Sequence, residues 1–205
     1  MKRALLIVLL ATCALAGTAR ADGDPASDYL LGTQVFLPFD VKLPANKQQE
    51  LVSTVRDANK SGYAIRVALI GSAYDLGAVT SLWRQPRPYA KFLGAELQFI
   101  YKRRLLIVMP NGFGFNWTNH PSSKEYAVLS TVSIGTGPVG MLDSSVAAVQ
   151  KLAAASGVKI VRTPGSSTTT KGKGFVHSRA LIVLAVVAGL ALAVLLRLAL
   201  RRKGP

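Results

Sequence analysis

The sequence is poor in cysteine, in histidine and in acidic residues. Its 205 residues include one cysteine, two histidines and ten acidic side chains, against 25 lysines and arginines. Cys13 lies in a segment that we expect to be removed, which excludes disulfides, thiol nucleophiles and cysteine-bound metals from the mature protein. Asp40, Glu96 and Glu125 form no cluster in sequence, so nothing supports a metal ion or another cofactor.

Two long apolar runs lie near the ends of the chain. Lys2 and Arg3 precede the run 4–16, and the small residues around Arg20 follow it, which predicts a secretory signal peptide at residues 1–21. An uncleaved signal anchor is the alternative. Residues 180–200 are Ala, Gly, Val, Ile or Leu except for Arg197. As a helix they would extend ~32 Å, enough to cross a hydrocarbon core of ~30 Å. The pattern predicts one C-terminal transmembrane helix.

The signal peptide places residues 22–163 outside the cytoplasm as one domain, joined to the membrane by a flexible Ser/Thr/Gly/Lys-rich tether at 164–179. Residues 201–205 form a basic cytoplasmic tail. The net charge of +15 comes mostly from these flanks, because residues 22–163 hold 15 basic and 10 acidic residues, a difference of +5. No nucleic-acid-binding signature is present. The expected partners are the membrane, and an envelope protein or an anionic polymer.

The pattern of residues 22–163 predicts an α/β fold. Apolar runs that suit strands alternate with segments of helical periodicity, which is typical of a three-layer α/β/α domain with a small, mostly parallel sheet. The expected strands are 63–71, 105–109 and 158–162. The expected helices are 46–60, 89–101 and one from Asp143 or Ser144 to 155, with a helical turn at 76–83. We further expect an edge strand or ordered arm at 29–41, an interruption at 85–88, a glycine-rich loop at 110–123, and a short strand or helix at 126–134.

In such a fold, ligands bind beyond the carboxyl ends of the strands. If the strands that end at Gly71 and Met109 are parallel neighbours, the loops 72–77 and 110–120 meet there. The sequence therefore predicts catalytic candidates at Asp75 and His120, and ligand-binding candidates at Asp75, Asn111, Gly112, Gly114 and Asn116.

Each candidate has a purely structural alternative. Asp75 is suited to cap the helical turn after it, and Gly112 and Gly114 to form turns. His120 is suited to a solvated loop, and a triad of Ser122, His120 and Asp75 lacks the G-x-S-x-G elbow. We expect Phe113, Phe115 and Trp117 to be packing residues. The second histidine, His177, is expected at the membrane interface.

Residues 135–140 match the pattern G-x-G-x-x-G. A dinucleotide site needs an acidic residue about 20 positions further on, but no acidic residue follows Asp143, and Met141 stands where a P-loop needs lysine. The match is therefore interpreted as a loop before the last helix.

The order of these segments resembles a divergent member of the TPM domain family over about residues 45–160. The resemblance lies in the helix 46–60, the strand 65–71, the segment 89–101 with Lys91 and Glu96, and the strand 104–109 with the Gly112 and Gly114 pair. It implies an exported α/β/α module, often anchored by a C-terminal transmembrane helix. Members include thylakoid-lumen proteins with reported acid phosphatase activity and bacterial membrane-anchored proteins of mostly unknown role.

Two functions follow as hypotheses. The first is a membrane-tethered extracytoplasmic module, located at the cell membrane, that binds a partner protein or envelope component without catalysis. The alternative is a weak phosphatase-like hydrolase that uses Asp75 and the loop 111–120.

Overall fold

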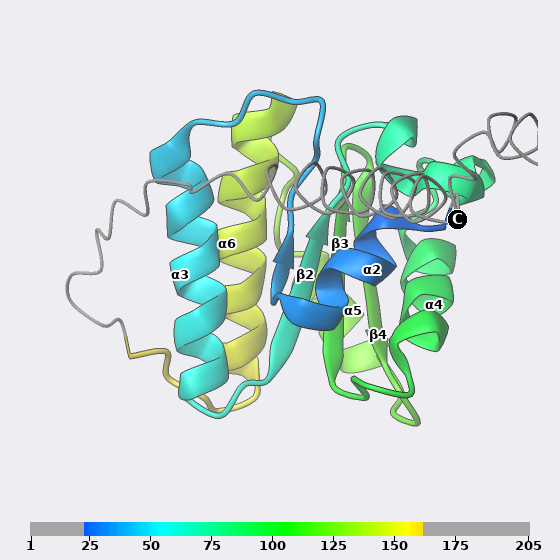
Figure 1. The fold of residues 1–205 in the computed structure, drawn as a ribbon. Helices are drawn as coiled ribbons and strands as arrows, with labels where there is room; N and C mark the ends of the chain where they lie inside the picture. Colours follow the sequence, from blue (N-terminus) through cyan, green and yellow to red (C-terminus); the bar gives the residue numbers. More distant parts are fainter. Residues whose placement is uncertain (1–22, 162–205) are drawn as a thin grey trace, which may run out of the picture. The chain divides into compact units, whose positions relative to one another are not determined.

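The structure, a computed structural model, describes residues 23–161 (Figure 1). A four-stranded sheet lies between helices that cover both of its faces. The elements in chain order are α2 (Pro25–Gly32), β1 (Val35–Phe36), α3 (Ala45–Lys60), β2 (Ile65–Leu69), the 3-10 helix η1 (Ala73–Leu82), α4 (Pro86–Leu97), β3 (Arg104–Met109), β4 (Gly112–Trp117), α5 (Ser123–Leu129) and α6 (Gly137–Ala155).

The sheet has the strand order β1-β2-β3-β4 and is mostly parallel. β1, β2 and β3 run in the same direction, and β4 pairs with β3 in the opposite direction. Leu69 lies opposite Val108, so β2 and β3 end at the same edge. The α/β class, the predicted helix 46–60 and the strands at 63–71 and 105–109 are confirmed.

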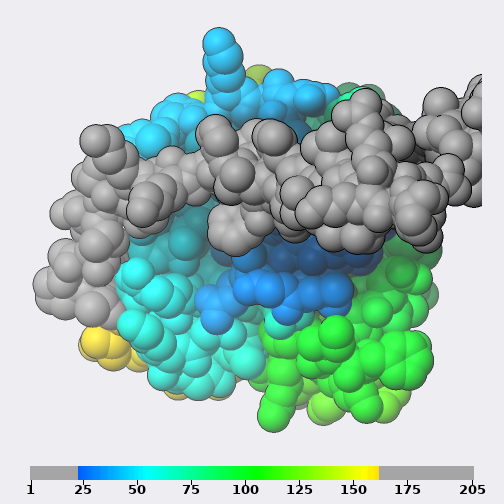
Figure 2. Space-filling view, viewed as in Figure 1, coloured from blue at the N-terminus to red at the C-terminus, as the bar shows by residue number. Residues whose placement is uncertain are grey.

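Alternation along the strands divides the core into two clusters. Val67 of β2 and Leu106 of β3 face α3 and α6, while their neighbours Ala68 and Ile107 face the other side, where α2, η1 and α4 pack. Figure 1 shows α3 and α6 side by side on one face, and Figure 2 shows α2 in blue between α3 and α4. The residues of both clusters lie between 26 and 160, so a chain that ends at Thr163 keeps the whole described core.

Several predicted elements of the first half differ from the structure. The expected arm at 29–41 is instead the helix α2 followed by the two-residue strand β1. Asp24 caps α2, with its Oδ1 accepting a hydrogen bond from the backbone N–H of Ala26. The segment 85–88 does not interrupt the chain, because Pro86 occupies the first turn of α4, where proline's missing N–H costs no hydrogen bond.

The second half departs further from the expectation. The predicted glycine-rich loop at 110–123 contains the strand β4, and the last helix begins at Gly137, before the expected Asp143. β4 lies close to α4 because Gly94 and Gly114 have no side chain: a Cβ on Gly94 would collide with Asn116, and one on Gly114 with the Pro86 carbonyl. Residues 158–161 form no strand; the N–H of Val161 donates to Ser61 Oγ at 3.2 Å.

The predicted signal peptide at 1–21, the tether at 164–179 with His177, the span at 180–200 and the tail at 201–205 all lie outside the described residues. Between residues 23 and 161, no helix combines the length and the apolar character that a membrane crossing requires.

Candidate functional site

The Asp75 carboxylate is fully buried and is held by three backbone N–H groups. Its Oδ2 accepts hydrogen bonds from Gly71 at 2.8 Å and Ser72 at 2.9 Å, and its Oδ1 accepts one from Phe39 at 3.2 Å. With the Ser72 side chain it forms a capping box at the start of η1. Asp75 therefore contributes to a helix start, but as the third residue of η1 paired with the N-cap residue Ser72, and not as the cap of a turn that begins at Leu76. Both carboxylate oxygens join the segments that follow β1 and β2.

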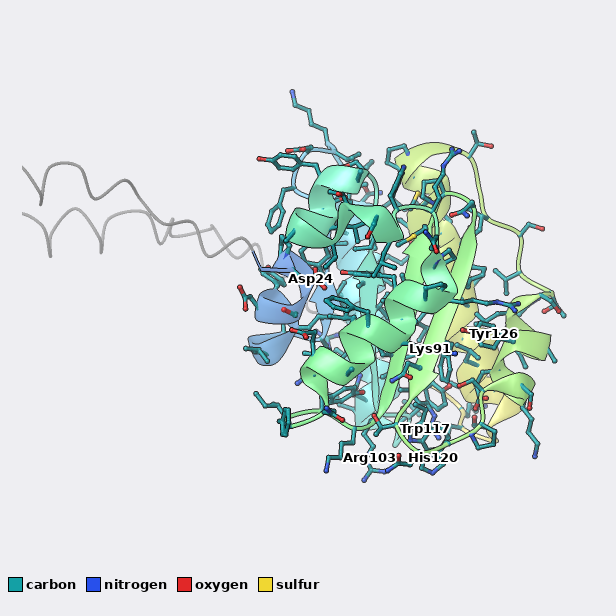
Figure 3. The ribbon with its side chains drawn as sticks, turned by 90° about the vertical axis from the view of Figure 1, so that its right-hand side faces the viewer. Asp24, Lys91, Arg103, Trp117, His120 and Tyr126 are labelled. Carbon is teal, nitrogen blue, oxygen red and sulfur yellow. The ribbon has the colours of Figure 1, made fainter. Side chains whose placement is uncertain are left out.

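The predicted meeting of Asp75 with His120 is wrong. β4 runs back from the edge where β2 and β3 end, so that Asn116 lies opposite Leu105 and Trp117 opposite Arg104, at the amino end of β3. His120 follows this strand and lies beside Trp117 at the lower end of Figure 3. A triad of Ser122, His120 and Asp75 would have to span the length of the sheet. The single structural reason is that residues 112–117 form an antiparallel strand.

The other predicted site residues divide between two places. Asn111 is in the turn between β3 and β4, where its Nδ2 donates to the Arg84 carbonyl at 2.6 Å, and Gly112 opens β4. Both line an open hollow of about 370 Å³ together with Arg87. Gly114 and Asn116 instead face α4, where they form part of the helix–sheet contact. Phe113 and Phe115 are buried in the core, as expected.

A cavity of about 320 Å³ lies where the three parallel strands end. Its lining comes from the segments after β1, β2 and β3 and from the start of α6: Pro38, Val41, Leu69, Gly71, Pro110, Ile134, Gly135, Thr136, Gly137, Pro138 and Met141. None of these described lining residues is charged. The site therefore lies at the edge that the fold predicts for a ligand, but different residues form it.

The G-x-G-x-x-G segment supplies one wall of this cavity. The prediction that residues 135–140 form a loop before the last helix holds only for Gly135 and Thr136, because α6 begins at Gly137 and includes the rest of the motif. A Cβ on Gly135 would lie 2.6 Å from the Gly140 backbone, so these two glycines let the loop fold closely onto the first turn of α6. Ser144 Oγ secures the loop by accepting a hydrogen bond from the Gly135 N–H at 2.8 Å. The G-x-G-x-x-G pattern therefore marked part of the cavity in the sequence, although the pattern was not interpreted as a binding site.

Polar groups at the cavity come mainly from the backbone. Thr136, the N-cap residue of α6, makes no side-chain capping hydrogen bond. The first N–H groups of a helix lack partners within the helix and carry a partial positive charge. The cavity thus combines apolar walls with the hydroxyl of Thr136 and the start of α6.

The opposite end of the sheet contains stacked cationic and aromatic side chains. The Arg104 guanidinium lies 4.3 Å from the ring centroid of Tyr63 and 3.9 Å from that of Trp117, and the Trp117 ring stacks on His120 at 3.9 Å. We call these four residues the aromatic stack. Burial raises the pKa of Tyr63 to about 12, against the opposing charge of Arg104. Arg104 Nε is buried without a hydrogen-bond partner among the described residues, so ring contacts provide its stabilisation.

A buried carboxylate that the sequence did not single out joins α2 to α4. Tyr89 donates its hydroxyl proton to Asp24, with Oη 2.9 Å from Oδ1 and 2.8 Å from Oδ2. Burial raises the pKa of Asp24 to about 6, although the hydrogen bonds from Tyr89 and Ala26 act in the opposite direction. Burial also raises the pKa of Tyr89. Neither residue lines the cavity or belongs to the aromatic stack, and the pair's role is to dock α2.

Among residues 23–161, no group of three or more His, Cys, Asp or Glu side chains is placed to hold a metal ion. Asp40, Glu96 and Glu125 lie on three different segments.

No protein-family model matches the chain, and no curated protein is significantly similar to it. Among solved structures, the chain is similar to the N-terminal domain of the cg2496 protein from Corynebacterium glutamicum, determined by solution NMR. The sequences are 14% identical, the match covers 66% of this chain and 85% of that chain, and the TM-score is 0.39, too low to support an argument. The TPM resemblance stays a prediction.

Proposed function

We propose that this protein is a membrane-tethered extracytoplasmic module that binds an apolar part of a partner protein or envelope component in the cavity at the carboxyl ends of β2 and β3. The observation that carries the proposal is the cavity itself: about 320 Å³, walled mainly by apolar side chains, at the edge where ligands bind in open α/β sheets. Its size suits one large side chain or a small apolar molecule.

Two exposed aromatic residues extend the apolar surface beside the cavity. Phe39 is 60% exposed and follows the lining residue Pro38, and Tyr74 is 68% exposed three residues after Gly71. Exposed aromatic side chains next to a cavity are typical of protein-binding surfaces, where they contribute large contact areas at little entropic cost. A partner that inserts one apolar side chain would cover both of them.

The geometry gives the phosphatase alternative no comparable support. Asp75 already accepts hydrogen bonds on both carboxylate oxygens, and His120 lies at the other end of the sheet. A general acid or base must reach the reacting group within hydrogen-bond distance. We therefore propose binding as the function of the cavity.

The binding proposal is tested by placing a photo-crosslinking amino acid at Val41, inside the cavity, in the full chain in its native membrane. We expect a discrete crosslinked product, identified by mass spectrometry, that Thr136→Trp abolishes by filling the cavity. The Thr136 side chain makes no capping hydrogen bond, so this substitution removes no hydrogen bond from the start of α6. The matched control has the crosslinker at Lys91, which is exposed on α4 away from the cavity (Figure 3).

Two outcomes decide the test. A product from Val41 that is absent from Lys91 and lost in Thr136→Trp supports the cavity as the binding site. The same products from both positions, or a Val41 product that Thr136→Trp leaves unchanged, would refute it.

Export of the domain is tested separately with a topology reporter fused after Ser156. We expect the reporter to be active outside the cytoplasm, because the predicted signal peptide exports residues 22–163. Activity confined to the cytosol would contradict the export proposal whatever the cavity binds.

A further inference from the structure

The turn between α4 and β3 exposes two large apolar side chains. α4 ends at Leu97, so Phe99 and Ile100 fall outside the helix face that packs on the sheet. Phe99 is 88% exposed and Ile100 is 63% exposed. The helix expected over 89–101 is wrong at this end, because α4 stops before both residues. Apolar side chains of this size cost free energy in water, so a surface that covers them is favoured.

Basic residues surround this apolar pair. Lys102 and Arg103 follow it after the half-buried Tyr101, and both are exposed. Lys60, at the end of α3, and Lys159, after α6, are exposed at the same end of the domain. Figure 3 shows Arg103 at this end beside Trp117 and His120. Segments that bind the interface of an anionic membrane typically combine apolar side chains with lysines and arginines.

The acidic residues near this end leave its positive charge largely unopposed. Asp57 is buried in the last turns of α3 and its Oδ1 pairs with Arg56 Nε at 3.2 Å. Glu125 is half-buried in α5. Glu96 is exposed, but it lies on α4 before the turn, and it contributes to the raised pKa of Asp24.

The described chain also leaves the domain at this end. The N–H of Val161 donates to Ser61 Oγ at 3.2 Å, at the end of α3 from which the chain enters β2. Val161 itself is 70% exposed. Eighteen residues, 162–179, separate it from the predicted span. They reach at most roughly 60 Å when extended, so the tether holds the domain near the bilayer at an effective concentration of about millimolar.

We propose that Phe99, Ile100, Lys102 and Arg103 form a docking face that inserts into the anionic headgroup layer of the membrane to which the protein is tethered. The proposal rests on the tether of the proposed function. The apolar pair enters the interface while the two basic side chains pair with lipid phosphates. Because the docking face lies at the amino end of β3 and the cavity at its carboxyl end, docking turns the cavity away from the bilayer, toward a partner.

The test uses the full chain in proteoliposomes of phosphatidylcholine with or without phosphatidylglycerol, with a specific protease site placed within residues 164–173. Before cleavage, the chain should remain with the vesicles in alkaline buffer, as a spanning protein does. After cleavage, the released domain should stay bound to vesicles that contain phosphatidylglycerol at low salt, and leave vesicles of phosphatidylcholine alone. Salt should weaken the binding, because it screens exposed charges.

Two charge-reversal variants locate the surface. Lys102→Glu with Arg103→Glu should lower the partition coefficient of the released domain on the order of 30-fold. The matched control, Lys42→Glu with Lys91→Glu, makes the same change in net charge away from the docking face and should lower it by about threefold or less. Phe99→Ser with Ile100→Ser should weaken binding at high salt as well, because apolar contacts are not screened.

The outcomes separate the two proposals. If the uncleaved chain stays with the vesicles but the cleaved domain does not bind phosphatidylglycerol, the docking face is refuted and the tether stands. Equal losses in the two charge-reversal variants also refute the docking face. If alkali extracts the uncleaved chain, the tether fails, and the inference that rests on it fails too.

Discussion

Replacing Asp24 by asparagine should remove a pH dependence from the stability of the domain. Asp24 is buried with 5% of its surface exposed, and Tyr89 donates to its carboxylate. Burial raises its pKa from the ordinary value of 3.8 to about 6. The amide side chain of the Asp24→Asn variant would keep an acceptor for Tyr89 and Ala26, but it does not ionise. The substitution therefore isolates the charge from the hydrogen bonds.

The sign follows from linkage. Well below pH 3.8 the carboxyl group is protonated in both the folded and the unfolded chain, so its favourable contribution is fully present. As the pH rises from about 3 to about 6, the unfolded chain ionises first and the folded state loses this advantage. A pKa that moves from 3.8 to about 6 corresponds to about 3 kcal/mol in the free energy of unfolding. Above the pKa of Asp24 in the folded state, the free energy of unfolding has lost this contribution completely and no longer changes with pH through Asp24.

The assay is urea unfolding of the chain 22–163, followed by circular dichroism at several pH values. We expect the difference in free energy of unfolding between the parent and Asp24→Asn to change by about 3 kcal/mol between roughly pH 3 and pH 7, in favour of the variant at the higher pH. Asp40→Asn, exposed in the segment after β1, is the matched control and should follow the parent.

A difference between parent and Asp24→Asn that stays constant across this range would refute the reasoning, because it would mean that the carboxyl group titrates alike in both states. Tyr89→Phe provides a second check. Its hydroxyl lowers the pKa of Asp24, so its removal should raise that pKa further and move the loss of stability to higher pH.

Three further predictions concern the fold around the site. Asp75→Ala leaves three N–H groups without their acceptor and should lower the free energy of unfolding by about 3 kcal/mol or more, measured by urea unfolding. Gly114→Ala should cost about 1–3 kcal/mol because its Cβ collides with α4, whereas Gly32→Ala, with no atom within 4 Å, should cost less than about 0.5 kcal/mol in the same assay. Arg104→Lys should lower stability by about 1 kcal/mol and shift tryptophan emission, because lysine cannot stack flat within the aromatic stack.

The parts of the fold that the sequence predicted well have strong local patterns. α3 shows helical spacing of Leu51, Val55 and Ala58, all of which are buried on one side of the helix. β3 is a continuous apolar run because both faces of its sheet are covered by helices. In these segments the local preference and the tertiary environment agree.

The sequence analysis predicted a loop in place of β4 because of its two glycines. Gly112 and Gly114 weaken the strand pattern of residues 112–117, and glycine usually indicates a turn. The structure places Gly114 against the Pro86 carbonyl, so here glycine serves the close approach of α4. The start of α6 was missed for a similar reason, because Gly135, Gly137 and Gly140 indicate a loop. In the structure α6 begins at Gly137, and Gly135 packs closely on Gly140 in its first turn.

The sequence by itself determined the chemistry of the two sheet faces, the surplus of basic residues and the prediction of an exported, membrane-tethered domain, because these depend on composition and on periodicity within one segment. Only the tertiary structure decided which residues meet. The reversal of β4 carried Asn116 and His120 to one end of the sheet, and the start of α6 brought Thr136 to the other. Those positions depend on pairings between segments far apart in the chain, which no local pattern specifies.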